Sequence, residues 1–252
     1  MPSFGTPKDA LLISDLLISD LSLPTQTSWL IPLYGFMGVL VALPWAVGWF
    51  RRDAHRPAAY LNILLTLVAF LHGSLVLRDV MQSGPASLNF PWLTVADLQL
   101  DISFSLSLSN VAALELITGL SLVSQIYSLG YMDKEWALAR FFALLGFFEG
   151  AMSGVVLSDS LFQSYFLLEM LTLSTYLLVG FWYAQPLVIT AARDAFLTKR
   201  VGDVLLLMGV VALAAFAGVM GFEDLYAWAS TDSLSPLATT LIGLGLIAGP
   251  MG

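Results

Sequence analysis

Residues 161–210 read LFQSYFLLEMLTLSTYLLVGFWYAQPLVITAARDAFLTKRVGDVLLLMGV. Two long apolar runs are separated by a short connection at residues 184–186, a pattern typical of two membrane-spanning helices joined by a tight turn. The first run carries one acid, Glu169, near its centre. The second run contains five charged residues, which are Arg193, Asp194, Lys199, Arg200 and Asp203. Because charged groups inside apolar segments are costly in lipid, these side chains are candidates for an ion pathway.

The composition places the whole chain in a membrane. Of its 252 residues, 58% are hydrophobic and 11% are charged, and the mean hydropathy is +0.84. A soluble domain carries about 25% charged residues. Apolar runs of ~20 residues are long enough to cross ~30 Å of hydrocarbon, and they lack the alternation of β-barrel strands. We therefore predict an all-α fold, a polytopic transmembrane helical bundle.

The apolar runs predict six full spans, at residues 28–50, 59–77, 110–131, 137–157, 161–183 and 191–219. Residues 78–108 are polar and partly alternating, which predicts a small β-hairpin outside the membrane. Residues 1–27 are expected to form an N-terminal surface segment, and residues 28–252 one transmembrane domain. The apolar run 237–252 contains Gly249-Pro250, which predicts the start of a broken seventh helix. We expect the natural polypeptide to continue beyond it.

The basic residues predict the orientation of the bundle. The connections after the first, third and fifth predicted spans, with the helix starts beside them, hold eight of the ten Lys and Arg residues. Since Lys and Arg concentrate on the cytoplasmic side, the N-terminus and the hairpin are expected to be lumenal.

Several kinds of chemistry are absent from the sequence. There is no cysteine, which excludes iron–sulfur ligation by this chain. The two histidines, His55 and His72, would lie ~25 Å apart on a continuous helix, too far to share a haem. No phosphate-binding loop, dinucleotide fingerprint or metal-ligand cluster occurs. We therefore expect no catalytic redox site, cofactor, metal or nucleic-acid partner in this chain.

Two acids are expected at mid-membrane. Glu149 lies ten residues before Asp159 and Glu169 ten residues after it, so both should lie ~15 Å from the same surface. Facing carboxylates at one depth resist ionising together, which predicts a shared proton. The alternative is that one of them is a buried polar anchor.

The sixth predicted span adds a charged helix face. Asp203 follows Lys199 by four residues and Arg200 by three, so either base can meet the acid on one face. The functional hypothesis is a charge pair that shifts when a proton arrives, and the alternative is a local salt bridge. Glu115, near the start of the third span, is interpreted as structural. The glycines at 146, 150 and 154 predict close packing of a neighbouring helix.

Four segments in order resemble the subunit-5 family of complex I, the antiporter-like subunits of proton-pumping NAD(P)H–quinone oxidoreductases. They are IYSLGYM at 126–132, ARFFA at 139–143, YLLVGFWY at 176–183 and RVGD at 200–203. The resemblance covers residues 104–252 well. It implies that Glu169 matches the family's membrane glutamate, Asp203 its acidic partner, and that a lysine follows Gly252. It also implies quinone and iron–sulfur clusters in partner subunits, and a neighbouring antiporter-like subunit in the same bilayer.

The sequence departs from the family pattern near these acids. Leu168 replaces an aromatic residue, Asp194 replaces a common lysine, and Glu149 stands where a small or hydroxyl residue is usual. These departures resemble the cyanobacterial form found in CO2-uptake complexes, which implies a thylakoid location, ferredoxin as electron donor and a CO2-hydration subunit as partner. Two alternatives remain open: a subunit of a multi-subunit cation/proton antiporter, and a structural or assembly protein.

Overall fold

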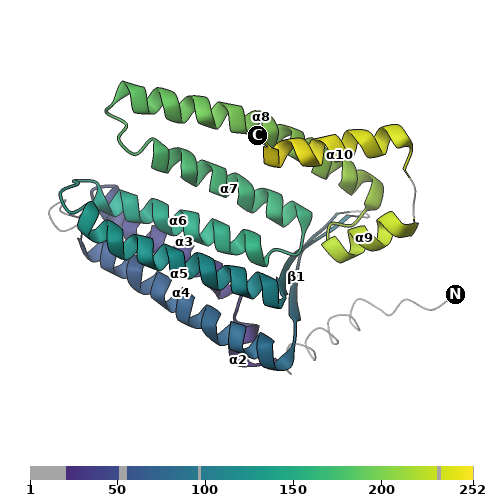
Figure 1. Cartoon of the computed structure of the whole chain (residues 1–252), viewed down its shortest axis with the longest axis horizontal. Helices are drawn as coiled ribbons and strands as arrows, with labels where there is room; N and C mark the ends of the chain where they lie inside the picture. The colour runs from purple at the N-terminus through teal and green to yellow at the C-terminus, as the bar shows by residue number, and fades with distance from the viewer. Residues whose placement is uncertain (1–20, 51–55, 96–97, 232–233, 252) are drawn as a thin grey trace.

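The structure is a computed structural model that describes residues 21–50, 56–95, 98–231 and 234–251. Five of its helices are long and apolar enough to cross a membrane, and two shorter apolar helices accompany them. Most of the predicted N-terminal segment, and Arg51, Arg52 and His55, lie outside the described residues. In chain order (Figure 1), the elements are α2 (Leu23–Gln26), α3 (Leu30–Ala46), α4 (Arg56–Ser83), β1 (Ala86–Val95), β2 (Leu98–Leu106), α5 (Leu108–Tyr131), α6 (Leu138–Leu157), α7 (Leu161–Val179), α8 (Pro186–Ala217), α9 (Phe222–Thr231) and α10 (Pro236–Met251).

The predicted helical bundle is confirmed, but several helix ends differ from the prediction. The first predicted span is shorter, because α3 ends at Ala46, two residues after Pro44. Helix α8 is longer and begins at Pro186, in the first turn, where proline is favoured. Its 32 residues extend ~48 Å, more than the ~30 Å of hydrocarbon. Helix α10 continues through Gly249 and Pro250, so the predicted break does not occur before Met251.

Glycines bring α3 and α6 into backbone contact. A Cβ atom on Gly35 would lie 2.6 Å from the backbone nitrogen of Gly150 and 2.7 Å from the carbonyl oxygen of Gly146. Side chains at these positions would hold the helices apart. The predicted close packing is therefore confirmed for Gly146 and Gly150, while Gly154 faces Leu167 on α7.

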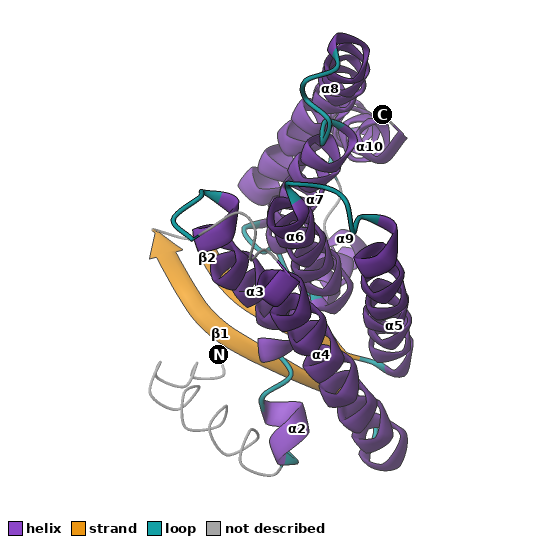
Figure 2. Ribbon diagram, turned by 90° about the vertical axis from the view of Figure 1, so that its left-hand side faces the viewer, coloured by secondary structure: helices purple, strands orange, loops and turns teal. Residues whose placement is uncertain are grey.

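The predicted β-hairpin is also confirmed, and it closes one end of the bundle (Figure 2). Strands β1 and β2 pair antiparallel, with Leu88 opposite Phe104 and a register shift between Pro91 and Leu93. Leu88 and Leu106 are buried in a core cluster that also contains Leu157 at the end of α6. Buried apolar side chains thus fix the hairpin to the helices.

The second half of the chain forms a thinner layer beside this bundle (Figure 1). Helix α7 lies between α6 and α8, and α10 packs on α8. Gly209 and Gly245 allow that second contact, since a Cβ on Gly245 would lie 2.9 Å from the carbonyl oxygen of Leu205. Glu169 on α7 and Arg200 on α8 form an ion pair where these two helices meet.

Candidate proton-relay site

An ion pair joins α7 to α8. The Arg200 Nη1 atom donates to Oε2 of Glu169, and the hydroxyl of Tyr165 donates to Oε1 across 2.8 Å. The Glu169 side chain is 19% exposed and that of Arg200 38%. Tyr165 precedes Glu169 by one helical turn, so local helix geometry presents both groups on one face. Each carboxylate oxygen of Glu169, the candidate relay acid from the sequence, therefore accepts one hydrogen bond.

A second charge pair lies beside the first on α8. Lys199 Nζ is 3.7 Å from Oδ1 of Asp203, and the Asp203 side chain is 7% exposed. The other oxygen of Asp203, Oδ2, is buried and has no hydrogen-bond partner among the described residues. Of the two pairings that the spacing allows, the structure forms Lys199 with Asp203. Arg200 instead reaches across to Glu169 on α7. Its guanidinium also lies 4.8 Å from the ring centre of Phe196 on its own helix, α8.

Glu149 lies in a different environment. It is 2% exposed, and its Oε2 atom accepts hydrogen bonds from Thr66 on α4 (2.6 Å), and from Ser121 (2.7 Å) and Gln125 (3.0 Å) on α5. Gln125 also donates to Thr66 across 2.7 Å. This polar cluster is enclosed by three helices.

The structure does not bring Glu149 and Glu169 together, as the shared-proton hypothesis required. Gly154 marks the side of α6 that faces α7, because a Cβ there would lie 3.1 Å from Leu167. Five residues separate Glu149 from Gly154, which corresponds to ~140° around the helix. Equal depth therefore did not imply facing side chains, because the rotation of α6 directs Glu149 toward α4 and α5.

Sequence reasoning missed the neutral partners of both acids. Tyr165, Thr66, Ser121 and Gln125 are common polar residues of membrane helices. The available signal was spacing: Tyr165 stands four residues before Glu169, and Ser121 four before Gln125. Glu115, interpreted as structural, accepts a hydrogen bond from Ser74, and its other oxygen is buried without a partner in the described part of the chain.

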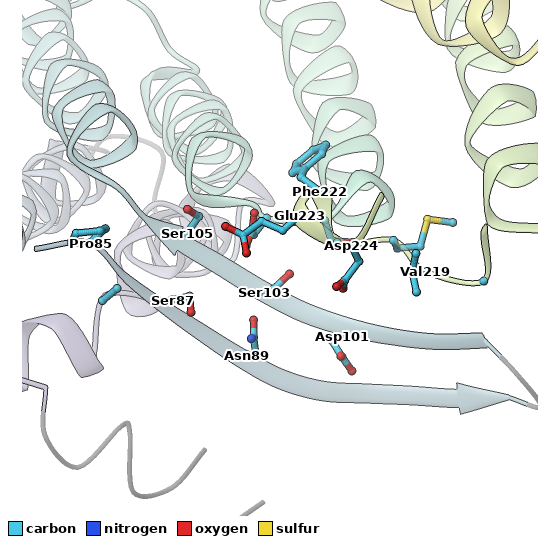
Figure 3. A pocket seen from close by; sticks show the side chains of 16 residues that line it. Pro85, Ser87, Asn89, Asp101, Ser103, Ser105, Val219, Phe222, Glu223 and Asp224 are labelled. Atoms are coloured by element: carbon cyan, nitrogen blue, oxygen red, sulfur yellow. The ribbon is translucent and has the colours of Figure 1, made fainter. Parts of the chain in front are cut away.

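An acidic pocket opens at the hairpin end, between β1–β2 and the start of α9 (Figure 3). Its volume is about 500 Å³, and its lining includes Asp101, Asp159, Glu223 and Asp224. Burial raises the pKa of Asp159, and the negative charges of Glu223 and Asp224 raise it further. Within the described ranges, no group of three or more His, Cys, Asp or Glu side chains could hold a metal ion.

Helices long and apolar enough to cross a membrane, two of them joined by an ion pair, define this chain as an integral membrane protein with charge pairs on its apolar helices. Two family models match it. Residues 92–142 match the N-terminus of NADH–ubiquinone oxidoreductase (complex I) chain 5, and residues 158–252 match the transmembrane domain of NADH:quinone oxidoreductases and Mrp antiporters. The chain belongs to this antiporter-like family of complex I chain 5.

Two relatives agree with this assignment. The chain is 74% identical over 234 residues to NAD(P)H-quinone oxidoreductase subunit 5, organellar chromatophore 2, of Paulinella chromatophora, covering 92% of this chain and 38% of the relative. It is 31% identical over 235 residues to the chloroplastic subunit 5 of Hordeum vulgare, covering 89% of this chain and 31% of the relative. The chain thus spans about a third of the length of these relatives.

The fold is also similar to a chain of the membrane-bound sulfane sulfur reductase, an archaeal respiratory membrane complex. The TM-score is 0.73 at 15% sequence identity, covering 89% of this chain and 44% of the other. At that identity the similarity concerns the fold alone.

Proposed function

We propose that this chain is part of a membrane-arm subunit of a proton-pumping NAD(P)H- or ferredoxin–quinone oxidoreductase, and that the charged residues of its apolar helices relay protons. The proposed relay residues are Glu169, Arg200, Lys199, Asp203 and Glu149. The observation that carries the proposal is the Glu169–Arg200 ion pair between two apolar helices. Intramembrane ionisable pairs of this kind mark ion pathways. The names of the relatives from Paulinella chromatophora and barley support the choice of complex.

The two charge pairs on α8 suggest how the relay works. A proton that binds Glu169 removes its negative charge and so weakens the attraction for Arg200. Asp203, three residues beyond Arg200, offers a buried oxygen without a described partner. Arg200 can then swing to Asp203 on the same helix face, which weakens the Lys199–Asp203 pair and passes the electrostatic change along α8.

The surroundings of the subunit follow from the same proposal. Electron transfer belongs to partner subunits that hold quinone and iron–sulfur clusters, and a neighbouring antiporter-like subunit continues the charged axis through the bilayer. We place the complex in the thylakoid membrane with the N-terminus lumenal. The CO2-uptake form, with a CO2-hydration subunit as partner, rests on Glu149 and Asp194, which depart from the family pattern.

The test is Glu169→Gln in the full-length protein. Glutamine keeps the size and hydrogen bonding of glutamate but cannot ionise. We expect proton translocation per electron, normalised to assembled complex, to fall by about half or more, because an ionisable group on the proposed pathway is lost. Glu135→Gln, which removes a carboxylate from the α5–α6 connection, is the matched control. Unchanged pumping in an assembled Glu169→Gln complex would contradict the relay.

The family description itself favours a second candidate, because it includes Mrp antiporters. A purified complex that exchanges cations for protons and lacks iron–sulfur subunits would support that function. A purely structural or assembly role predicts the opposite of the relay: less complex, but normal pumping by each complex that assembles.

A further inference from the structure

The Glu149 cluster has a charge arrangement unlike that of Glu169. Its three donors, Thr66, Ser121 and Gln125, are neutral, and all of them point to the same oxygen, Oε2. No described Lys, Arg or His forms an ion pair with Glu149. The second oxygen, Oε1, is buried and without a hydrogen-bond partner among the residues described.

This geometry indicates what balances the charge. A buried carboxylate without a cation is strongly unfavourable. A metal ion would need oxygen lone pairs directed at it, whereas the cluster directs O–H and N–H groups at Oε2. A proton on Oε1 of Glu149 removes the unbalanced charge and leaves Oε2 free to accept the three hydrogen bonds. It also turns Oε1 into a hydrogen-bond donor in a cluster where Oε1 of Gln125 is a buried acceptor that has no described partner either.

A polar stripe connects this cluster toward the hairpin end of the bundle. Glu115, Thr118, Ser121 and Gln125 follow one another along α5 at spacings of three, three and four residues, which keeps them on one side of the helix. Thr118 and Gln125 are completely buried. Glu115 lies ~9 Å along the helix from Ser121, accepts a hydrogen bond from Ser74 on α4, and places Oε2 against Gly73.

We propose that Glu149, held by Thr66, Ser121 and Gln125, is a second proton-binding site, separate from the Glu169–Arg200 pair. A proton reaches this site from the hairpin side of the bundle, past Glu115 and Ser74. In the loading step a proton leaves the carboxyl group of Glu115, crosses through water and the hydroxyls of the stripe, and binds Oε1 of Glu149. Glu149 changes from a carboxylate to a carboxylic acid while Glu115 changes from a carboxylic acid to a carboxylate, so the net charge of the two is unchanged. Thr66, Ser121 and Gln125 are positioning residues. The proposal rests on the proposed relay function but concerns a different branch of it.

The experiment compares Glu149→Gln, Glu149→Asp and Glu149→Ala in the full-length subunit within its complex. Two quantities are measured: proton translocation per electron, and the infrared carbonyl band of protonated carboxylic acids. We expect Glu149→Gln to lose one such band and to lower translocation by about half, because one of two proton branches is removed. Glu149→Asp should keep part of both signals, and the control Glu135→Gln should keep all of them.

The outcomes separate this site from the main relay. If Glu149→Gln keeps the full infrared signal and full translocation, Glu149 is a polar anchor and the inference is overturned, while an impaired Glu169→Gln leaves the proposed function standing. If Glu169→Gln pumps normally, the main relay fails, and the infrared band of Glu149 still decides whether a proton is bound there. Should Glu149→Ala fail to assemble, the Gln and Asp variants carry the test.

Discussion

At the scale of single residues, the two acids Glu169 and Glu149 differ in the charge of their partners. Glu169 is bound by a cation and a phenol, and Glu149 by two hydroxyls and an amide. The first arrangement places a positive charge directly against the carboxylate. The second arrangement contains no positive charge in the described contacts. The proposed relay therefore assigns the two acids to different branches.

Removing the phenol should weaken the Glu169 relay without breaking it. We expect Tyr165→Phe to weaken the hold on the Glu169 side chain by about 1.5 kcal/mol, the lower end for a hydrogen bond to a charged group. Proton translocation at low driving force should then fall severalfold. Tyr127→Phe on the exposed face of α5 is the control. Equal translocation in the two variants would show that Tyr165 does not act on Glu169.

Asp159 in the acidic pocket makes a small pH-dependent contribution to stability. Its pKa is raised by burial and by Glu223 and Asp224, so the folded state holds its proton to higher pH than the unfolded state does. This contribution is therefore favourable at low pH and is lost as pH rises above the usual Asp value. We expect Asp159→Asn to raise the free energy of unfolding at pH 7 by less than about 1 kcal/mol, seen as a higher melting temperature, and to leave it unchanged at pH 4. An equal shift at both pH values would contradict this.

At the scale of elements, the contact of α3 with α6 depends on missing side chains. Gly35, Gly146 and Gly150 let two backbones approach, and a Cβ on Gly150 would lie 2.8 Å from the carbonyl oxygen of Pro32. Backbone atoms cannot move aside as side chains can. Small residues of this kind are the usual means of helix association in lipid.

Alanine at Gly150 should therefore separate these helices. We expect Gly150→Ala to destabilise the bundle by about 1–3 kcal/mol, as overpacking does, and to lower the melting temperature in detergent. Gly130→Ala on α5 is the matched control, since a Cβ there has nothing within 4 Å. If both variants melt alike, the close approach of α3 and α6 is not what limits stability.

At the scale of the whole molecule, the connections are sorted to two ends (Figure 1). The hairpin, α9 and the α6–α7 connection lie at one end, and the α5–α6 and α7–α8 connections lie at the other. Arg56 and Asp133 form an ion pair at the second end, where Lys134 and Arg140 also lie. This distribution supports a cytoplasmic location for the basic end.

Cysteine labelling can test that orientation, because the sequence contains no cysteine. Asn89 on the hairpin and Ala184 in the α7–α8 connection are both exposed. We expect a membrane-impermeant thiol reagent to label Asn89→Cys from the lumenal side and Ala184→Cys from the cytoplasmic side of oriented vesicles. Labelling of both from one side would contradict the six-span arrangement, and the reverse pattern would contradict the orientation.

Much of the fold could be predicted because a continuous apolar run of the sequence specifies each membrane helix. An apolar run of sufficient length must form a helix in lipid, since its backbone groups have no other partners. This holds for α4 to α8, and the hairpin followed from its alternation. Helix ends were predicted less well. Helices α4 and α8 begin at Arg56 and Pro186, in short segments beside polar residues whose composition fits a loop as well as a helix.

The charged residues of the candidate site were evident from the sequence, whereas their partners were not. Glu169, Glu149, Lys199, Arg200 and Asp203 stand out because charge is rare in apolar runs. That an apolar bundle forms, and which residues in it carry charge, the sequence determined by itself. Only the tertiary structure decided that Arg200 binds Glu169 on another helix and that Glu149 faces α4 and α5. Those choices depend on the rotation of each helix about its axis, which is set by side-chain packing between distant segments.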